Sequence, residues 1–355
     1  MDAMKLVSRT LATMALAAVV FAGCGGDEDE PSAAAAPAGS EEAQLAEEAQ
    51  KEGTLNFYTS ADPVTAQKMA DAFGDKYDLD VTFTRLTSGP IAARYAAEAQ
   101  AGTFAADVVM IADEKFFANN LEKDWMLPMD EANVPNVADL DDKFQFDGSV
   151  GIGVSRLNGI VANTEAISEG DVPKSWEDLL DPQWKGRLIT DDPRAIPVVM
   201  GQWQLLEETY GKEYLEQTAA QEVQFVPSLV TGVQSVAAGE RDAAYGANLL
   251  HVNPLTTSAP DAPVKLTYLE GPDFGFTWNA GVSAKSKNPA AGRLFVNWLL
   301  TEEGQKAFNG PGNNSVLPSV TIPESPPLDA DFVTLSADVP EAEAKEIVSA
   351  LGLSG

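Results

Sequence analysis

Short apolar runs alternate with amphipathic segments early in the chain, and this alternation constrains the fold more than any other feature. Residues 55–59, 81–84 and 106–111 are strand-like runs rich in aliphatic and aromatic side chains. The segment between the first two carries one apolar stripe at helical spacing, made of Ala66, Met69, Ala70 and Phe73. Strand–helix alternation of this kind predicts an open α/β sheet that binds ligands at the carboxyl ends of its strands.

A second informative stretch reads Pro-Lys-Ser-Trp-Glu-Asp-Leu-Leu-Asp-Pro-Gln-Trp-Lys-Gly-Arg over residues 173–187. Ser175 is suited to cap a short helix that Pro182 ends, and a strand over 187–190 follows. Asp192-Pro193 then predicts the start of another helix. Thr190 and Arg194 flank this junction, which favours an anion or another polar ligand.

Three motifs together resemble a known family. They are the stretch just described, the Asp-Pro-Arg at residues 192–194, and Val-Gln-Ser-Val-Ala-Ala-Gly-Glu at residues 233–240. They are similar to the substrate-binding proteins of bacterial ABC importers, in the branch associated with ferric iron, phosphonates, sugar phosphates, thiamine and polyamines. The resemblance covers roughly residues 53–320. It implies a two-lobed α/β fold of the type II periplasmic binding proteins, with an open sheet in each lobe and a ligand cleft between them.

The predicted division of the chain follows from two crossings between lobes, an extended one over residues 150–163 and a returning pair of strands over 264–268 and 274–283. We expect lobe 1 over 53–155, lobe 2 over 156–270, a return to lobe 1 over 271–320, and a C-terminal tail with a short helix over 321–355.

The N-terminus has the features of a secretory signal over residues 1–23: basic Lys5 and Arg9, then an apolar run that ends at Ala22-Gly23-Cys24. Cys24 is the only cysteine, so no internal disulfide can form. Its position resembles a bacterial lipobox and implies lipidation of Cys24. Phe21 departs from the usual leucine, and a secreted protein without an anchor is the alternative. The acidic, Ala- and Pro-rich residues 24–52 predict a disordered tether to the cell membrane, outside the cytoplasm.

The sequence lacks the residues and motifs that several kinds of catalytic and metal site require. With His251 as its single histidine, the chain cannot build a multi-histidine metal centre, and it has no Gly-x-Ser-x-Gly elbow or phosphate-binding P-loop. We therefore expect no catalytic residues, no metal site and no cofactor. A formal charge of −31 disfavours nucleic acid as a partner. The expected partners are a small-molecule ligand and the permease and ATPase of an importer, with the protein itself a monomer.

Candidate ligand contacts are polar residues at predicted strand ends or crossings: Ser60, Ser88, Thr190, Asp192, Arg194, Tyr245 and Asn279. Ser60, Ser88 and Arg194 are expected to converge on one anionic group, because strand-to-helix junctions and a guanidinium both favour negative charge. Ferric members of the resembling family carry adjacent tyrosines, whereas residues 248–251 here read Asn-Leu-Leu-His, which disfavours direct iron binding. A small organic anion is therefore preferred.

Other functions stay open at this point. A polyamine or another cation is the alternative ligand, and it would use carboxylates such as Asp113 and Asp192. An iron complex also remains an alternative. From other functional classes, a lipid-anchored sensor or adhesin without transport and a lipid-anchored enzyme remain as alternatives.

Overall fold

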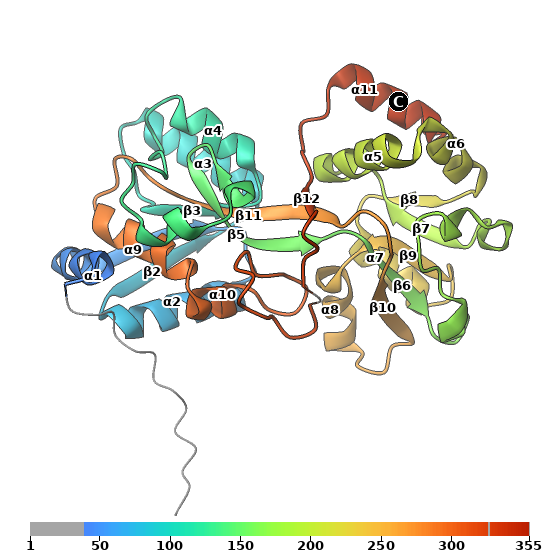
Figure 1. The fold of residues 1–355 in the computed structure, drawn as a ribbon, viewed down its shortest axis with the longest axis horizontal. Coiled ribbons are helices and arrows are strands. Elements are labelled where there is room, and N and C mark those ends of the chain that lie inside the picture. The colour runs from blue at the N-terminus through green and yellow to red at the C-terminus, as the bar shows by residue number, and fades with distance from the viewer. Residues whose placement is uncertain (1–38, 326, 355) are drawn as a thin grey trace, which may run out of the picture. The chain divides into compact units, whose positions relative to one another are not determined.

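Two β-sheets organise the chain (Figure 1). The computed structural model describes residues 39–325 and 327–354, so Cys24, the predicted signal and residues 24–38 of the predicted tether lie outside it. The first sheet has the order β2-β1-β3-β11-β5-β4, with β12 beside β11. Its strands are β1 Thr54–Thr59, β2 Asp80–Arg85, β3 Val108–Ile111, β4 Gln145–Phe146, β5 Ser149–Arg156, β11 Phe274–Val282 and β12 Val333–Thr334. The second sheet, in the order β10-β6-β9-β7-β8, contains β6 Gly159–Asn163, β7 Leu188–Asp191, β8 Gln224–Val226, β9 Ala243–Ala247 and β10 Val264–Tyr268.

Helices cover both faces of each sheet (Figure 1). We call the first sheet and its helices lobe 1: α1 Glu41–Glu52, α2 Pro63–Tyr77, α3 Ser88–Gln100, α4 Glu114–Leu121, α9 Pro289–Leu299 and α10 Glu302–Phe308. Lobe 2 is the second sheet with α5 Pro197–Tyr210, α6 Lys212–Ala220, α7 Leu229–Ala237, α8 Leu249–Ser258 and α11 Glu341–Ala350. The predicted α/β class and its two open sheets are therefore confirmed. No helix in the described residues is long and apolar enough to span a membrane.

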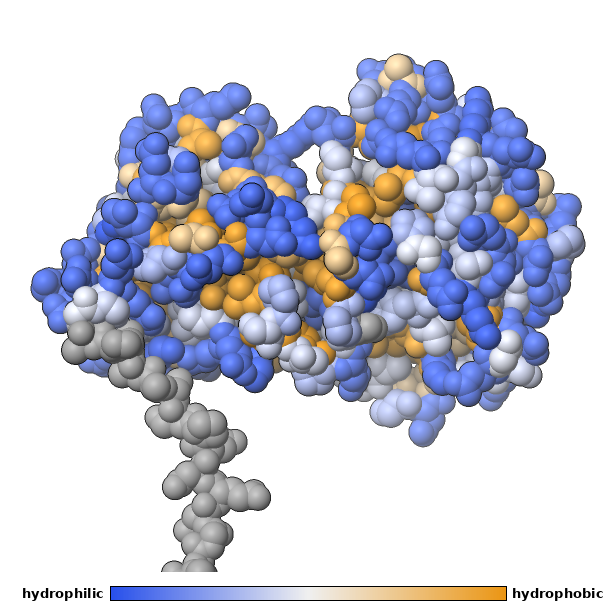
Figure 2. All heavy atoms as spheres, viewed as in Figure 1, coloured by the Kyte–Doolittle hydropathy of each residue, from blue (hydrophilic) through white to orange (hydrophobic). Residues whose placement is uncertain are grey.

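Each lobe has a separate apolar core on either face of its sheet. In lobe 1, Phe295 of α9 stacks on Phe57 of β1 with ring centroids 5.0 Å apart, and Phe73 of α2 packs edge to face against Phe295. In lobe 2, Trp176, Trp203 and Tyr245 pack edge to face. Polar residues cover most of the visible surface, and hydrophobic residues gather in the middle of the face shown in Figure 2.

The predicted tether over residues 24–52 is wrong for residues 41–52, which form helix α1. Ser40 caps its N-terminus through Ala43 N–H, and Gly53 ends it with the positive φ of 76° that glycine adopts without strain. Leu45 and Ala49 are buried against lobe 1, and the Glu52 carboxylate accepts bonds from the first amides of α9. Although the segment is acidic overall, its single apolar stripe is sufficient for α1 to pack against lobe 1.

The stretch around residues 173–197 also differs in part from its prediction. Ser175 Oγ accepts Asp178 N–H as a cap, and the following short helix is two 3₁₀ turns separated at Pro182. The next helix, however, begins at Pro197 and not at Pro193. The reason is local, because the Asp192 carboxylate accepts Arg194 N–H at 2.9 Å and closes a turn instead of capping a helix.

The C-terminal segment makes a third connection between the lobes. The expected helix is present as α11, and its Ile347 and Leu351 belong to the core of lobe 2. Before it, β12 pairs with β11 in lobe 1. Between these two elements, a Cβ on Gly201 of α5 would lie 2.1 Å from the Ser336 carbonyl oxygen, so only glycine permits this approach. We call residues 327–340 the strap.

Candidate functional site

Two predicted serines meet at the carboxyl edge of the lobe 1 sheet. Strands β1, β2 and β3 are parallel, so their carboxyl ends lie along the same edge. Ser60 follows β1 and is held there because its N–H bonds to Met110 O at 3.1 Å. Ser88 begins α3, and its hydroxyl donates to Ser60 Oγ at 3.2 Å. Both residues are half-buried, so a ligand can reach the pair.

The N-terminus of α3 adds backbone donors beside this pair. Its N-cap residue, Thr87, makes no side-chain capping bond. The first amides of a helix have no intrahelical acceptor, and the helix dipole places partial positive charge there. With Ser88 and Gly89 as its first two residues, the helix presents these amides next to the serine hydroxyls.

Arg85 supplies a positive charge at the same edge. It is the last residue of β2, and its Nε donates to Ala61 O at 3.1 Å, which holds the guanidinium beside the residue that follows Ser60. Arg85 is exposed, and it forms no ion pair with any residue in the described part of the chain. Sequence reasoning missed this residue, although its place at a strand end three residues before Ser88 is a usable signal. We call Ser60, Ser88, Arg85 and the first turn of α3 the serine corner.

A cavity of about 270 Å³ is lined by residues of both lobes. On the lobe 1 side it includes Ala112, directly after β3, and β3 is the neighbour in the sheet of β1, the strand that Ser60 follows. Its lining comes from α4, from α5, from β11 and from the strap: Ala112–Lys115, Ile196, Val198, Phe276, Thr277 and Leu335–Asp338.

Charged groups at the rim of this interlobe cavity are partly paired. Lys115 forms an ion pair with Asp338 of the strap. Asp113 caps α4, accepting Phe116 N–H at 3.1 Å. Burial raises the pKa of Glu114 above its ordinary value, and the neighbouring Asp113 charge raises it further. The cavity therefore has apolar walls and an acidic rim at α4.

Three of the predicted ligand-binding residues of lobe 2 are hydrogen-bonded to other residues of this chain. Thr190 is buried and donates to Tyr245 O at 2.9 Å within the sheet. Asp192 and Arg194 form an ion pair at 2.6 Å, and the Arg194 guanidinium also donates to Ser354 O. The hydrogen bonds from Arg194 hold the Asp192 pKa below its ordinary value. An anion could take the place of Asp192 only if this pair opened.

Two other predicted residues are fully enclosed. Tyr245 is 1% exposed and points into the core of lobe 2, where burial raises its pKa well above the ordinary value. It does not lie at the strand ends, where it was expected. Asn279 lies on β11 beside Ile111, with no exposed area and no hydrogen-bond partner for either amide atom among the described residues.

The sequence analysis missed a buried carboxylate of lobe 2, because it placed the strand at residues 187–190, one residue earlier than β7. Asp191 ends β7 and is 4% exposed, and its Oδ1 has no partner among the described residues. Burial raises its pKa to about 6. His251 Nε2 lies 4.0 Å from Asp191 Oδ2, and burial lowers the pKa of His251 to about 4. At neutral pH this is therefore an ionised acid beside a neutral imidazole, whose Nδ1 accepts Asn248 N–H.

Within the described residues, no group of three or more His, Cys, Asp or Glu side chains is arranged to hold a metal ion. Tyrosine hydroxyls could ligate ferric iron, but four of them are bonded to other groups of the protein: Tyr58 to Glu98, Tyr77 to Glu42, Tyr95 to Trp125 O and Tyr214 to Trp176 O.

Comparison with known proteins places this chain in a family. The family of bacterial extracellular solute-binding proteins matches residues 105–336. The Fe(3+)-binding periplasmic protein of Serratia marcescens is 25% identical over 264 residues, which cover 70% of this chain and 72% of that protein.

Solved structures share the whole fold at low sequence identity. Trichodesmium IdiA (FutA) in complex with iron and citrate has a TM-score of 0.66 at 20% identity, covering 84% of this chain and 98% of that one. AfuA from Actinobacillus pleuropneumoniae, with exogenous fructose-6-phosphate bound, has a TM-score of 0.59 at 21% identity, covering 85% and 99%. The family match covers more than half of the chain, so the chain belongs to the bacterial extracellular solute-binding proteins.

Proposed function

We propose that this solute-binding protein captures a small organic anion and that the acidic group of the ligand binds at the serine corner. The observation that carries the proposal is the 3.2 Å contact between Ser88 and Ser60 hydroxyls at adjoining strand ends. Those hydroxyls, the first amides of α3 and the Arg85 guanidinium are all hydrogen-bond donors. A carboxylate or phosphate offers the matching acceptors.

Local electrostatics favour an anion there in spite of the formal charge of −31. The carboxylate closest to Ser60 in the sequence is Asp62, which caps α2. It already accepts hydrogen bonds from Val64 N–H and from Thr65 N–H and Oγ–H. Closure of the lobes would remove water from the corner and strengthen each charge-assisted bond.

Two proteins of similar fold have been solved with anionic ligands, which supports this ligand class. AfuA carries a phosphorylated sugar, and FutA carries iron together with citrate, which is a carboxylate anion. Direct capture of ferric iron has less support, because the helix start at Leu249-Leu250 offers apolar side chains where oxygen ligands would be needed.

A thermal-shift panel tests the proposal. Inorganic phosphate, fructose 6-phosphate and citrate form the anionic set, and putrescine and spermidine form the cationic set. A ligand at 100 times its dissociation constant stabilises the folded state by about 2.7 kcal/mol. We expect stabilisation by at least one anion. Stabilisation by the polyamines alone would instead favour the second candidate, a cation held at the acidic rim formed by Asp113, Glu114 and Asp338.

We also propose that the protein acts as a monomer without enzymatic activity. Lipid on Cys24 would anchor it to the cell membrane on the extracytoplasmic side. The lipobox-like Ala22-Gly23-Cys24 supports anchoring. Cys24→Ser should release the protein from the membrane fraction or leave its signal uncleaved. A variant that stays processed and membrane-bound would exclude lipidation.

A further inference from the structure

The strand directions of the lobe 1 sheet turn its carboxyl edge toward lobe 2. Strand β3 is antiparallel to β11, and β11 is antiparallel to β5, so β5 runs parallel to β3 and β1. Strand β5 ends at Arg156, and the chain then enters lobe 2 at the start of β6 (Figure 1). The edge that carries the serine corner is therefore the edge that faces lobe 2.

The strand directions of lobe 2 turn its own carboxyl edge back toward lobe 1. Strand β9 is antiparallel to β6, with Ala247 opposite Gly159 at the point where β6 begins. Strand β7 runs parallel to β9, and β8 runs parallel to β7. The carboxyl ends of these three strands therefore lie where the chain arrives from lobe 1, and a solute held at the serine corner faces them.

Polar side chains from three elements meet at this edge of lobe 2. Asp191 ends β7, Ser228 is the N-cap residue of α7, and His251 lies in the first turn of α8. His251 Nε2 is 4.0 Å from Asp191 Oδ2. Burial raises the pKa of Asp191, and the backbone N–H of Leu229, next to Ser228, acts in the opposite direction. We call Asp191, Ser228 and His251 the lobe 2 corner.

Two side chains of the lobe 2 corner are accessible and have unused hydrogen-bonding capacity. His251 has 18% of its side chain exposed, and its Nδ1 accepts Asn248 N–H at 3.1 Å, so the ring proton is on Nε2. The 4.0 Å between Nε2 and Asp191 Oδ2 is too long for a hydrogen bond. Ser228 is half-buried, and its hydroxyl makes no capping bond. The corner therefore offers one N–H donor and one free hydroxyl.

The charge of Asp191 determines which solute group fits beside these two residues. The Asp191 side chain is only 6% exposed, so it acts mainly through its charge. The closest cation in the sequence, Arg194, is paired with Asp192. A second carboxylate or phosphate would be repelled here. An ammonium group could not accept the His251 N–H, whereas a neutral hydroxyl both donates and accepts.

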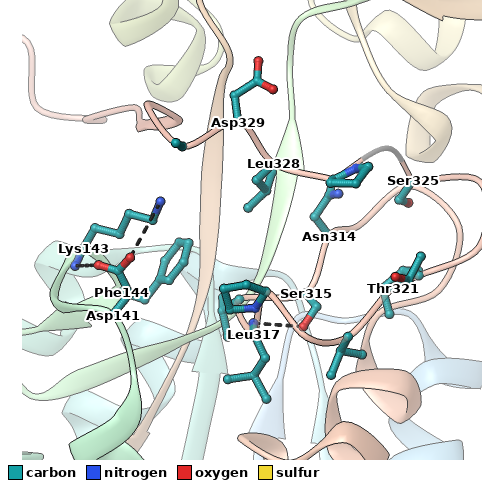
Figure 3. Close-up of a pocket in the computed structure, with 16 residues that line it drawn as sticks. Asp141, Lys143, Phe144, Asn314, Ser315, Leu317, Thr321, Ser325, Leu328 and Asp329 are labelled. Atoms are coloured by element: carbon teal, nitrogen blue, oxygen red, sulfur yellow. Dashed lines mark hydrogen bonds and ion pairs between the residues drawn. The ribbon is translucent and has the colours of Figure 1, made fainter.

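A larger cavity, of about 420 Å³, is not part of this arrangement. It lies between the 3₁₀ turn Asp142–Phe144 and the segment over residues 314–330 (Figure 3). None of its lining residues belongs to the serine corner or to the lobe 2 corner. A solute held at the serine corner would therefore meet the lobe 2 corner and not this cavity.

We propose that the lobe 2 corner recognises a hydroxyl group of the solute, which accepts a hydrogen bond from His251 Nε2–H and pairs with the Ser228 hydroxyl. The solute is then an organic acid or a phosphate monoester that carries at least one hydroxyl group. Its acidic group binds lobe 1 and its hydroxyl binds lobe 2. This inference rests on the proposed capture of an anion at the serine corner.

The test uses two pairs of three-carbon compounds that differ only in their hydroxyl groups. Glycerol 3-phosphate is compared with propyl phosphate, and glycerate is compared with propionate. Dissociation constants are measured by calorimetry on the purified protein. Ser228→Ala removes a hydroxyl that caps nothing, and His251→Phe keeps a planar ring without its N–H. Ser258→Ala, at an exposed serine of α8, is the matched control, and thermal unfolding shows whether each variant is folded.

We expect the parent and Ser258→Ala to bind the hydroxylated member of at least one pair about 10-fold more tightly than its deoxy partner. Ser228→Ala and His251→Phe should each lower this preference by about 2- to 10-fold, the worth of one hydrogen bond, and leave the affinity for the deoxy partner unchanged. A merely structural role would change both affinities together.

Equal affinities of the parent for both members of each pair would overturn the inference, and so would a preference that Ser228→Ala leaves unchanged. The absence of binding by all four compounds would overturn it as well. Capture of an anion at the serine corner would survive each of these results, provided that an anion of the thermal-shift panel still stabilises the parent.

Discussion

Arg156 and Asp273 form a buried ion pair where the two crossing strands pass between the lobes, with Nη2 2.8 Å from Oδ2. Arg156 ends β5 on the way out, and Asp273 directly precedes β11 on the way back. Burial raises the pKa of Asp273, while the Asp329 N–H and the Arg156 guanidinium act in the opposite direction. The strap bonds to both residues, so one ion pair joins all three connections between the lobes.

Removal of one partner should therefore be costly. Arg156→Met leaves a buried carboxylate without its cation, and such a change typically destabilises by about 3–5 kcal/mol. Chemical denaturation measures the free energy of unfolding. The control is Lys345→Met in the exposed α11 pair with Glu341, which should cost no more than about 0.5 kcal/mol. Equal effects of the two changes would mean that the buried Arg156–Asp273 pair contributes no more to stability than an exposed pair.

Helix α1 should contribute to folding, contrary to its acidic composition. Leu45 is 6% exposed, and Leu45→Ala should cost about 2–3 kcal/mol through lost burial and a residual cavity. Glu47→Ala on the exposed face is the control and should change stability by less than about 0.5 kcal/mol. If urea unfolding shows no difference between the two variants, α1 is not part of the cooperative unit.

Asp191 should make stability depend on pH in a defined direction. Its folded pKa of about 6 lies above its ordinary value of 3.8, so the folded state holds its proton more tightly. This group therefore lowers stability as pH rises from about 4 to 6, by roughly 2–3 kcal/mol in total. His251, with a pKa of about 4 instead of 6.5, acts oppositely and loses stability as pH falls through the same range.

Asp191→Asn separates the two contributions. The variant should be more stable than the parent by roughly 2–3 kcal/mol at pH 7.5, and this gain should vanish near pH 4, where the parent is protonated. Urea unfolding across pH 4 to 7.5 measures it. A gain that is constant with pH would show that Asp191 does not titrate in this range.

The two arginines at strand ends should behave differently in ligand binding. Arg85 has no ion-pair partner in the described chain, whereas Arg194 is bonded to Asp192 and Ser354. Arg85→Ala should weaken anion binding by about 2 kcal/mol or more if the contact is buried on closure, and Arg85→Lys should restore part of it. Arg194→Ala should leave affinity nearly unchanged. Calorimetry that finds the reverse order would restore Arg194 as the anion clamp.

Sequence patterns predicted the fold because the strands of both sheets are apolar runs with helix signals between them. The same reasoning brought Ser60 and Ser88 together, since parallel strands end at one edge. It could not place Tyr245, because Ala-Ala-Tyr-Gly-Ala has small neighbours on both sides and no alternation that assigns a face. The turn at Asp192 was also ambiguous, because a helix cap and a side-chain turn share the same residues.

The central claim, that the serine corner holds an acidic group of the solute, is tested most directly by calorimetry with the anion that stabilises the parent most in the panel. The dissociation constant is compared among the parent, the Ser60→Ala/Ser88→Ala double variant and the Ser258→Ala control. The double variant loses two hydrogen bonds to a charged group, at about 1.5–3 kcal/mol each, so its dissociation constant should be at least 100-fold larger than that of the parent. The Ser258→Ala control should keep the dissociation constant of the parent. A double variant that binds the anion as tightly as the parent would contradict the account.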